Sequence, residues 1–294
     1  MTGSTHGRAI AALLVAAFLF GATFVVIKSA VEDIGPLSFV AWRFLLGTSV
    51  LALFAIPRGR LIWRQGTLAG IALFAGYAFQ TAGLQHTTAS NSALITGLYV
   101  VITPFLAAAF FKHAPSGWTV GAAAVSFVGL VLLTGTDGLR VDRGDLLTVA
   151  CALAFALHIV LLARFARHHP VVPFTTVQLA VTAVLAFVLG FAVEGPGLPP
   201  SSVWGALLLT GLAISAGAFL LQIWAQTVVG PTTAAVIVAT ESVFGVGTAW
   251  IVLQERLGST GFAGASLMVV SVVVVIVKQR DPTAVAAESV TPAH

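Results

Sequence analysis

Glu241 is an acidic side chain in the middle of an otherwise apolar stretch, residues 232–253. If this stretch is a helix that crosses a bilayer, Glu241 lies about ten residues from its start, or ~15 Å deep at about 1.5 Å per residue. A charged carboxylate at that depth costs about 2.5–3.5 kcal/mol even on the scale derived from insertion experiments. We therefore expect Glu241 to face the interior of the protein, where it contacts a substrate or exchanges a proton. The alternative is a structural carboxyl group that hydrogen-bonds to neighbouring helices.

Two basic residues and a histidine interrupt other apolar stretches. Arg43 lies about seven residues, or ~10 Å, inside its stretch. There it is expected to attract an anionic or carboxylate-bearing substrate, or to pair with Glu241. Lys28 lies near the end of its stretch, so it either extends toward lipid headgroups or joins Arg43 in binding anions. His158 lies near the middle of its stretch and either relays protons or is held neutral by a hydrogen bond inside the bundle.

Uncharged polar residues complete the set of candidates. Such side chains in apolar helices either bond across helices or bind substrate. Gln222 and Gln226 lie one helical turn apart and share a face, which indicates a gate or vestibule, and Pro104 indicates a hinge or a static kink because it removes a backbone hydrogen bond. The cavity candidates are Tyr77, Gln80, Asn91 and Tyr99.

The stretches that position these residues have the length of membrane-spanning helices. Hydrophobic residues make up 58% of the chain and charged residues 8%, whereas soluble domains have roughly a quarter charged. The mean hydropathy is +1.03. A spanning helix needs about 20 mainly apolar residues. Ten such segments are predicted, at residues 10–30, 37–56, 67–84, 88–111, 118–133, 146–164, 172–193, 203–225, 232–253 and 259–277.

The basic residues orient these segments. Of the 14 Lys and Arg residues, nine fall in connections on one side, three on the other, and two inside segments. Because cytoplasmic loops carry the excess of positive charge, both termini are expected in the cytoplasm of a cell (inner or plasma) membrane protein. The basic residues are dispersed and form no block of the kind that binds nucleic acid. Nucleic acid is therefore not an expected partner.

The second half of the chain repeats the pattern of the first. Residues 20–25 (FGATFV) parallel residues 155–160 (FALHIV), and residues 84–133 parallel 225–276. Five crossings is an odd number, so the second copy enters the bilayer in the opposite sense, as in many secondary transporters. We expect one repeat at residues 9–135, a second at 144–278 and a short mobile cytoplasmic tail at 279–294.

Several short motifs resemble the drug/metabolite transporter superfamily, and specifically its EamA-type transporters. They are Phe20-Gly21-Ala22-Thr23-Phe24, Trp42-Arg43-Phe44, Asn91 with Gly97-Leu98-Tyr99, Pro104, and Glu241 followed by Leu253-Gln254-Glu255-Arg256-Leu257. The resemblance implies an all-α carrier of ten transmembrane helices in two inverted five-helix repeats around a central cavity. The chain departs from the family pattern at Phe20, where tryptophan is common, and at Ser242, where proline is common.

Sequence motifs of ATP hydrolysis, zinc proteolysis and serine hydrolysis are not found. The chain is therefore predicted not to be an enzyme and to need no cofactor or metal. We expect a secondary transporter of small organic metabolites that works by alternating access with proton coupling, with export favoured over import. A passive channel is the second hypothesis and an intramembrane enzyme the third. The expected partners are a small-molecule substrate and the lipid bilayer, and a homodimer is left open.

Overall fold

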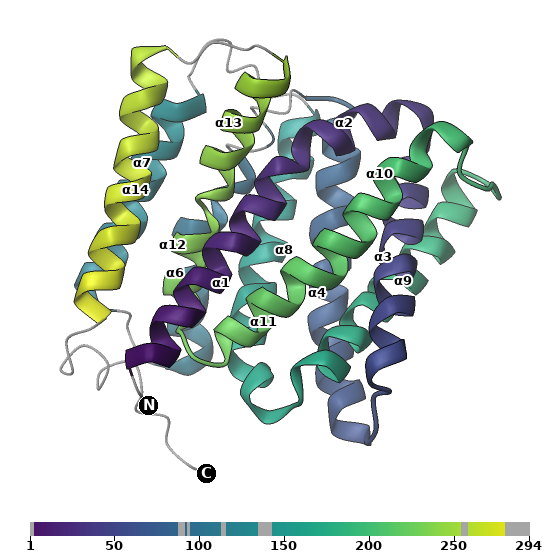
Figure 1. Ribbon diagram of the computed structural model, residues 1–294, viewed down its shortest axis with the longest axis horizontal. Coiled ribbons are helices and arrows are strands. Elements are labelled where there is room, and N and C mark those ends of the chain that lie inside the picture. Colours follow the sequence, from purple (N-terminus) through teal and green to yellow (C-terminus); the bar gives the residue numbers. More distant parts are fainter. Residues whose placement is uncertain are drawn as a thin grey trace.

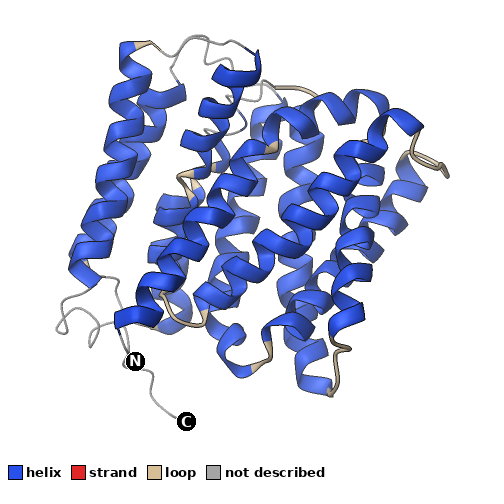
Figure 2. Cartoon of the chain, in the orientation of Figure 1, coloured by secondary structure: helices blue, strands red, loops and turns tan. Residues whose placement is uncertain are grey.

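A computed structural model describes residues 3–87, 92, 95–112, 116–134, 143–253 and 258–279. Within these ranges the regular structure is entirely helical, and strands are not found (Figure 2). The helices stand side by side in one bundle (Figure 1). The first part of the chain forms α1 (Gly3–Ala22), α2 (Phe24–Asp33), α3 (Pro36–Phe54), α4 (Arg60–Leu84), α6 (Tyr99–Phe111) and α7 (Gly117–Thr134).

The remainder begins with the long helices α8 (Arg143–Phe165) and α9 (Val171–Val193), which the short 3₁₀ helix η1 (Ala166–His168) separates. A composite span follows, made of the 3₁₀ helix η2 (Ser201–Val203), α10 (Trp204–Leu208), the π-helix η3 (Leu209–Ala218) and α11 (Phe219–Gln226). The chain then forms α12 (Pro231–Val238), α13 (Glu241–Leu253) and α14 (Ser259–Gln279).

Eight helical stretches of the described chain are long and apolar enough to cross a membrane. They correspond to eight of the ten predicted segments. The other two segments, 88–111 and 118–133, correspond to shorter apolar helices, Tyr99–Phe111 and Gly117–Leu132. Much of the predicted segment before Tyr99 lies outside the described residues.

Three predicted segments are single in the sequence but interrupted in the structure. Segment 10–30 divides at Thr23 into α1 and α2, and segment 232–253 divides at residues 239–240 into α12 and α13. Segment 203–225 contains the π-helix η3. Apolar length predicts a crossing because it measures hydrophobic thickness. It does not reveal where the backbone hydrogen-bonding pattern changes along that crossing.

The outer surface of the bundle is strongly apolar. Leu53 is 84% exposed, and Phe105 and Phe191 are each 66% exposed. Inside the bundle, small residues let helices approach closely: a Cβ atom added at Gly129 in α7 would lie 2.7 Å from the backbone oxygen of Gly264 in α14. The exposed apolar side chains and the long apolar helices together indicate a multi-pass membrane protein.

Candidate functional site

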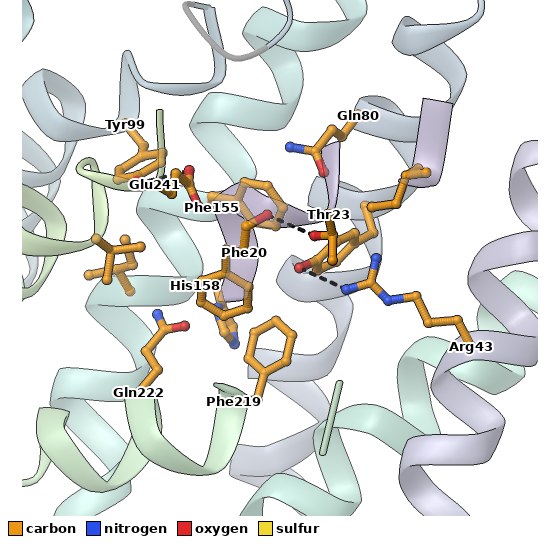
Figure 3. Close-up of a pocket in the computed structure, with 14 residues that line it drawn as sticks. Phe20, Thr23, Arg43, Gln80, Tyr99, Phe155, His158, Phe219, Gln222 and Glu241 are labelled. Atoms are coloured by element: carbon orange, nitrogen blue, oxygen red, sulfur yellow. Dashed lines mark hydrogen bonds between the residues drawn. The ribbon is translucent and has the colours of Figure 1, made fainter. Parts of the chain in front are cut away.

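A cavity in the centre of the bundle contains about 550 Å³ of space unoccupied by atoms. Side chains of nine helices contribute to its wall, and Figure 3 shows the labelled ones pointing toward a common space. These helices are α1, α2, α3, α4, α6, α8, α11, α12 and α13. The lining residues are Phe20, Thr23, Ile27, Arg43, Tyr77, Gln80, Tyr99, Phe155, His158, Ile159, Phe219, Gln222, Val238 and Glu241.

Two helices begin at the wall of this cavity, and their first residues contact each other. Tyr99 is the first residue of α6 and follows a turn at residues 97–98, while Glu241 is the first residue of α13 and follows a turn at residues 239–240. The Tyr99 hydroxyl donates a hydrogen bond of 3.1 Å to Oε1 of Glu241. Both side chains are buried, with 2% and 8% exposure. Glu241 therefore meets the cavity at the N-terminus of a helix, where the backbone dipole favours negative charge.

Arg43 is a fully buried cation on the opposite side of the cavity in the view of Figure 3. Its Nε donates to Oγ of Ser215 at 3.0 Å, and its Nη2 donates to the Tyr77 hydroxyl at 3.5 Å. The guanidinium carbon lies 4.6 Å from the centroid of the Tyr77 ring and 5.2 Å from that of Phe44. These partners are all neutral. Arg43 and Glu241 thus line one cavity, and within the described chain they form no ion pair with each other.

His158 is held by an amide of the neighbouring helix. Its Nε2 lies 2.8 Å from Oε1 of Gln178, whose Nε2 donates to the backbone oxygen of Phe174 at 3.2 Å. Because this second bond uses the amide nitrogen of Gln178, the amide oxygen is left as the acceptor. We therefore assign the Nε2 proton to His158, which is only 2% exposed. The sequence did not single out Gln178 as a site residue, and its place here is that of a partner to His158.

The other amides make bonds to helix neighbours. Gln80 Nε2 donates to Oγ1 of Thr96 at 3.4 Å, and this hydroxyl is 3.8 Å from the Cys151 thiol. Gln222 Nε2 donates to Oε1 of Gln226 at 3.3 Å, and Gln226 Nε2 donates to the backbone oxygen of Ile159 at 2.9 Å. Only Gln222 of this predicted pair lines the cavity. Both amide atoms of Gln226 are hydrogen-bonded to other residues of the protein.

Seven of the predicted site residues line the cavity: Arg43, Tyr77, Gln80, Tyr99, His158, Gln222 and Glu241. Pro104 does not line it and lies buried inside α6. Lys28 belongs to α2, but its side chain is outside the described part, and so is the whole of Asn91.

Most of the lining residues that sequence reasoning missed are apolar or aromatic, and the three phenylalanines among them pack with the predicted Tyr77. The four rings of Phe20, Tyr77, Phe155 and Phe219 form a contiguous group, since Phe219 lies 5.2 Å from Phe20 and 6.0 Å from Tyr77, and Tyr77 lies 5.2 Å from Phe155, centroid to centroid. A signal for two of them was present, because the FGATFV and FALHIV stretches align Phe20 with Phe155. The same alignment pairs His158 with Thr23, another lining residue that was missed.

In the described part of the chain, a helical bundle with an apolar outer surface encloses a cavity lined by buried ionisable groups, which is the architecture of a membrane protein whose polar groups face its interior. The chain belongs to the EamA-like transporter family, whose sequence profile matches residues 7–135 and 142–277. The expected membership of the EamA-type drug/metabolite transporters is thereby confirmed.

Curated relatives are named as transporters. An uncharacterized transporter of Archaeoglobus fulgidus is 32% identical over 278 residues, which cover 90% of this chain and 84% of the relative. The uncharacterized transporter YyaM of Bacillus subtilis is 30% identical over 211 residues, 64% of this chain and 67% of the relative. These names indicate a transporter rather than an enzyme.

One solved crystal structure has the same fold. It superimposes with a TM-score of 0.78, covers 95% of this chain and 99% of its own, and is 20% identical in sequence. At this identity the likeness concerns the fold alone.

Proposed function

We propose that this protein is a secondary transporter that carries small organic molecules across the cell membrane by alternating access, with export favoured over import. The observation that carries this proposal is the central cavity, which combines a buried cation, a buried acid and four aromatic rings. A cavity inside the bundle suits a carrier because substrate sites of such proteins lie near the bilayer midplane. Family membership supports the same conclusion.

The architecture we propose is ten transmembrane helices in two inverted repeats, residues 9–135 and 144–278, with both termini cytoplasmic. Two observations support equivalent halves. Phe219 packs on Phe20 and Tyr77 packs on Phe155 at the same centroid separation, 5.2 Å. Furthermore, a helix begins in mid-span at Tyr99 in one half and at Glu241 in the other, after a two-residue turn in each case. Two such halves can exchange inward- and outward-facing shapes around one shared site.

Arg43 is the group we propose to bind the substrate. A buried guanidinium whose described partners are hydroxyl groups and aromatic rings keeps its positive charge uncompensated. A carboxylate or phosphate on the substrate would supply the missing charge and could bind the planar fork through two hydrogen bonds. The aromatic rings would cover the apolar part of the same molecule. We therefore propose a small organic anion, or a zwitterion that carries a carboxylate, as the substrate class.

Glu241 is the group we propose for proton coupling. Glu241 is 8% exposed, and among the described residues its carboxyl group receives one hydrogen bond, from the Tyr99 hydroxyl, at 3.1 Å. Leaving a carboxylate charged in such surroundings is costly unless a cation joins it. Protonation from one side of the membrane and deprotonation to the other would change the charge of the cavity wall, and thus the affinity for an anionic substrate in each half of the cycle.

Flux measurements in proteoliposomes test this function. An untargeted comparison of metabolites retained and released by cells with and without the protein first identifies candidate substrates. Purified protein in liposomes is then expected to give saturable uptake of such a metabolite, and counterflow when the liposomes are preloaded with it. Empty liposomes and the Arg43→Gln variant are the controls. Linear, non-saturable flux without counterflow would contradict the carrier and favour a channel, and a chemically altered product would favour an enzyme.

A further inference from the structure

Two close contacts show how the helices beside the cavity correspond between the proposed halves. A Cβ atom added at Gly211 would lie 3.0 Å from the backbone oxygen of Arg43, and one added at Gly70 would lie 3.0 Å from the backbone oxygen of Gln178. Arg43 and Gln178 hold the same place in their helices, since each comes seven residues after the first residue of α3 or α9. Gly70 and Gly211 are therefore equivalent positions.

The ring contacts give a second pair of equivalent positions further along the same helices. Phe20 and Phe155 are aligned in the sequence, and each packs at 5.2 Å on a ring from the other half, Phe219 and Tyr77 respectively. Tyr77 and Phe219 are therefore equivalent. Tyr77 comes seven residues after Gly70, whereas Phe219 comes eight residues after Gly211. The second half carries one residue more than the first over this interval.

The extra residue coincides with the π-helix. Helix α4 is continuous from Arg60 to Leu84, whereas the equivalent span of the second half changes to a π-helix over Leu209–Ala218. A π-helix has a wider turn than an α-helix and in proteins is often found at functional sites. The wider turn takes up the added residue, so that the positions on either side of it, Gly211 and Phe219, keep the contacts of Gly70 and Tyr77.

The inserted region provides the hydroxyl group that accepts from Nε of Arg43. Ser215 lies inside the π-helix, is fully buried, and accepts the hydrogen bond from Nε of Arg43 at 3.0 Å. The corresponding interval of α4, residues 71–76, reads IALFAG and contains no hydroxyl side chain. The residue of the second half that is equivalent to Arg43 is Gln178, and it bonds to His158 of its own half. The two halves therefore differ at this point in both the polar residue and its partner.

We propose that the one-residue insertion in η3 makes Ser215 the positioning residue of Arg43. The Ser215 hydroxyl fixes the Nε edge of the guanidinium, and the Tyr77 ring lies against its face. The terminal nitrogens, one of which reaches only the Tyr77 hydroxyl at 3.5 Å, are then directed to an incoming anionic group. This proposal rests on the proposed role of Arg43 in binding the substrate. It explains why only one of two equivalent places in the bundle becomes an anion site.

Anion selectivity of the purified full-length protein tests the proposal without knowledge of the natural substrate. The probes are benzoate and benzamide, which have similar shapes and differ in charge, and their dissociation constants are obtained from ligand-dependent thermal unfolding. The variants are Ser215→Ala, which removes the acceptor, and Ser215→Thr, which keeps it. Thr210→Ala is the matched control, because this buried hydroxyl of the same π-helix donates to the backbone oxygen of Ala206 at 2.7 Å.

We expect Ser215→Ala to weaken benzoate binding at least about tenfold, the lower end of the range for a hydrogen bond to a charged group, and to leave benzamide binding unchanged. Ser215→Thr and Thr210→Ala should keep the selectivity of the unmodified protein. A purely structural role of Ser215 would lower the affinity for both probes equally, and this result would overturn the proposal, as would unchanged selectivity in Ser215→Ala. If the unmodified protein does not prefer benzoate to benzamide, the anion site proposed for Arg43 fails, and its positioning residue fails with it.

Discussion

Replacement of Arg43 by glutamine separates a binding role of this residue from a structural one. Glutamine is a natural test because Gln178 holds the equivalent position in the second of the two proposed repeats. The substitution loses a charge-assisted hydrogen bond to Ser215, about 1.5–3 kcal/mol, and a desolvated cation–π contact with Tyr77, about 2 kcal/mol. It also relieves the cost of a cation buried at membrane depth, about 2.5–3.5 kcal/mol. These contributions largely cancel, so the free energy of unfolding should fall by no more than about 2.5 kcal/mol.

Anion binding has no such compensation. Loss of a charge-assisted contact to the ligand removes about 1.5–3 kcal/mol, which at about 1.4 kcal/mol per tenfold corresponds to a roughly 10- to 150-fold weaker affinity. We therefore expect Arg43→Gln to remain folded and to lose benzoate binding by this factor, with benzamide binding unchanged. Arg43→Lys should give an intermediate affinity, because lysine keeps the charge but lacks the planar fork.

The assay combines thermal unfolding with binding in the same preparation, and with KM for flux once a substrate is identified. Arg64→Gln in α4 is the matched control, since Arg64 is exposed and does not line the cavity. An equal loss of affinity for charged and neutral ligands would refute the reasoning. So would a collapse of stability in Arg43→Gln without any change in the selectivity of the remaining folded protein.

Two further predictions concern the helix breaks. Glu241→Gln is expected to preserve folding, because glutamine matches the shape of glutamate and can accept the hydrogen bond from Tyr99. The same variant is expected to abolish the pH dependence of flux. If the variant keeps the pH dependence of the unmodified protein, Glu241 is a packing residue. Gly21→Ala is expected to destabilise the protein by at least about 1–3 kcal/mol, the range for overpacking, because its Cβ atom would collide with the backbone oxygen of Glu241. Thermal unfolding measures this loss, with Gly7→Ala in the same helix as the control, since nothing lies within 4 Å of a Cβ atom there. Equal melting temperatures for the two alanine variants would show that α1 and α13 separate without cost.

The polar site residues could be predicted from the sequence because the bilayer makes them exceptional. Arg43, Glu241 and His158 stand in apolar segments where a charged or titratable group needs a partner or a cavity. The structure places all three around one cavity. The apolar lining was not predictable in the same way. Phe219 and Val238 are apolar residues in apolar segments, like most of their sequence neighbours. Only the packing of the helices decides which of these apolar residues face the cavity.

The interruptions of the helices were missed for a different reason. The turns before Tyr99 and Glu241 and the π-helix around Ser215 are changes in backbone hydrogen bonding, and none of these three places contains a proline that would have indicated the change. The insertion in η3 becomes visible only when the contacts of Gly70 and Gly211 are compared. Sequence resemblance between the halves was too weak to fix the register within one residue. The role of Gln226 was likewise decided by its neighbours, since the backbone oxygen of Ile159 takes one end of its amide.

Cys151 gives the protein a built-in reporter of motion. It is the only cysteine of the chain, it is completely buried, and its thiol lies 3.8 Å from the Thr96 hydroxyl, three residues before the start of α6. Alkylation by a membrane-impermeant maleimide therefore requires the helices around Thr96 to separate. The maleimide is added to one face of a sealed vesicle at a time, and the intact mass of the protein follows the reaction. Its rate would report how often Cys151 becomes exposed to that face, without any substitution in the chain.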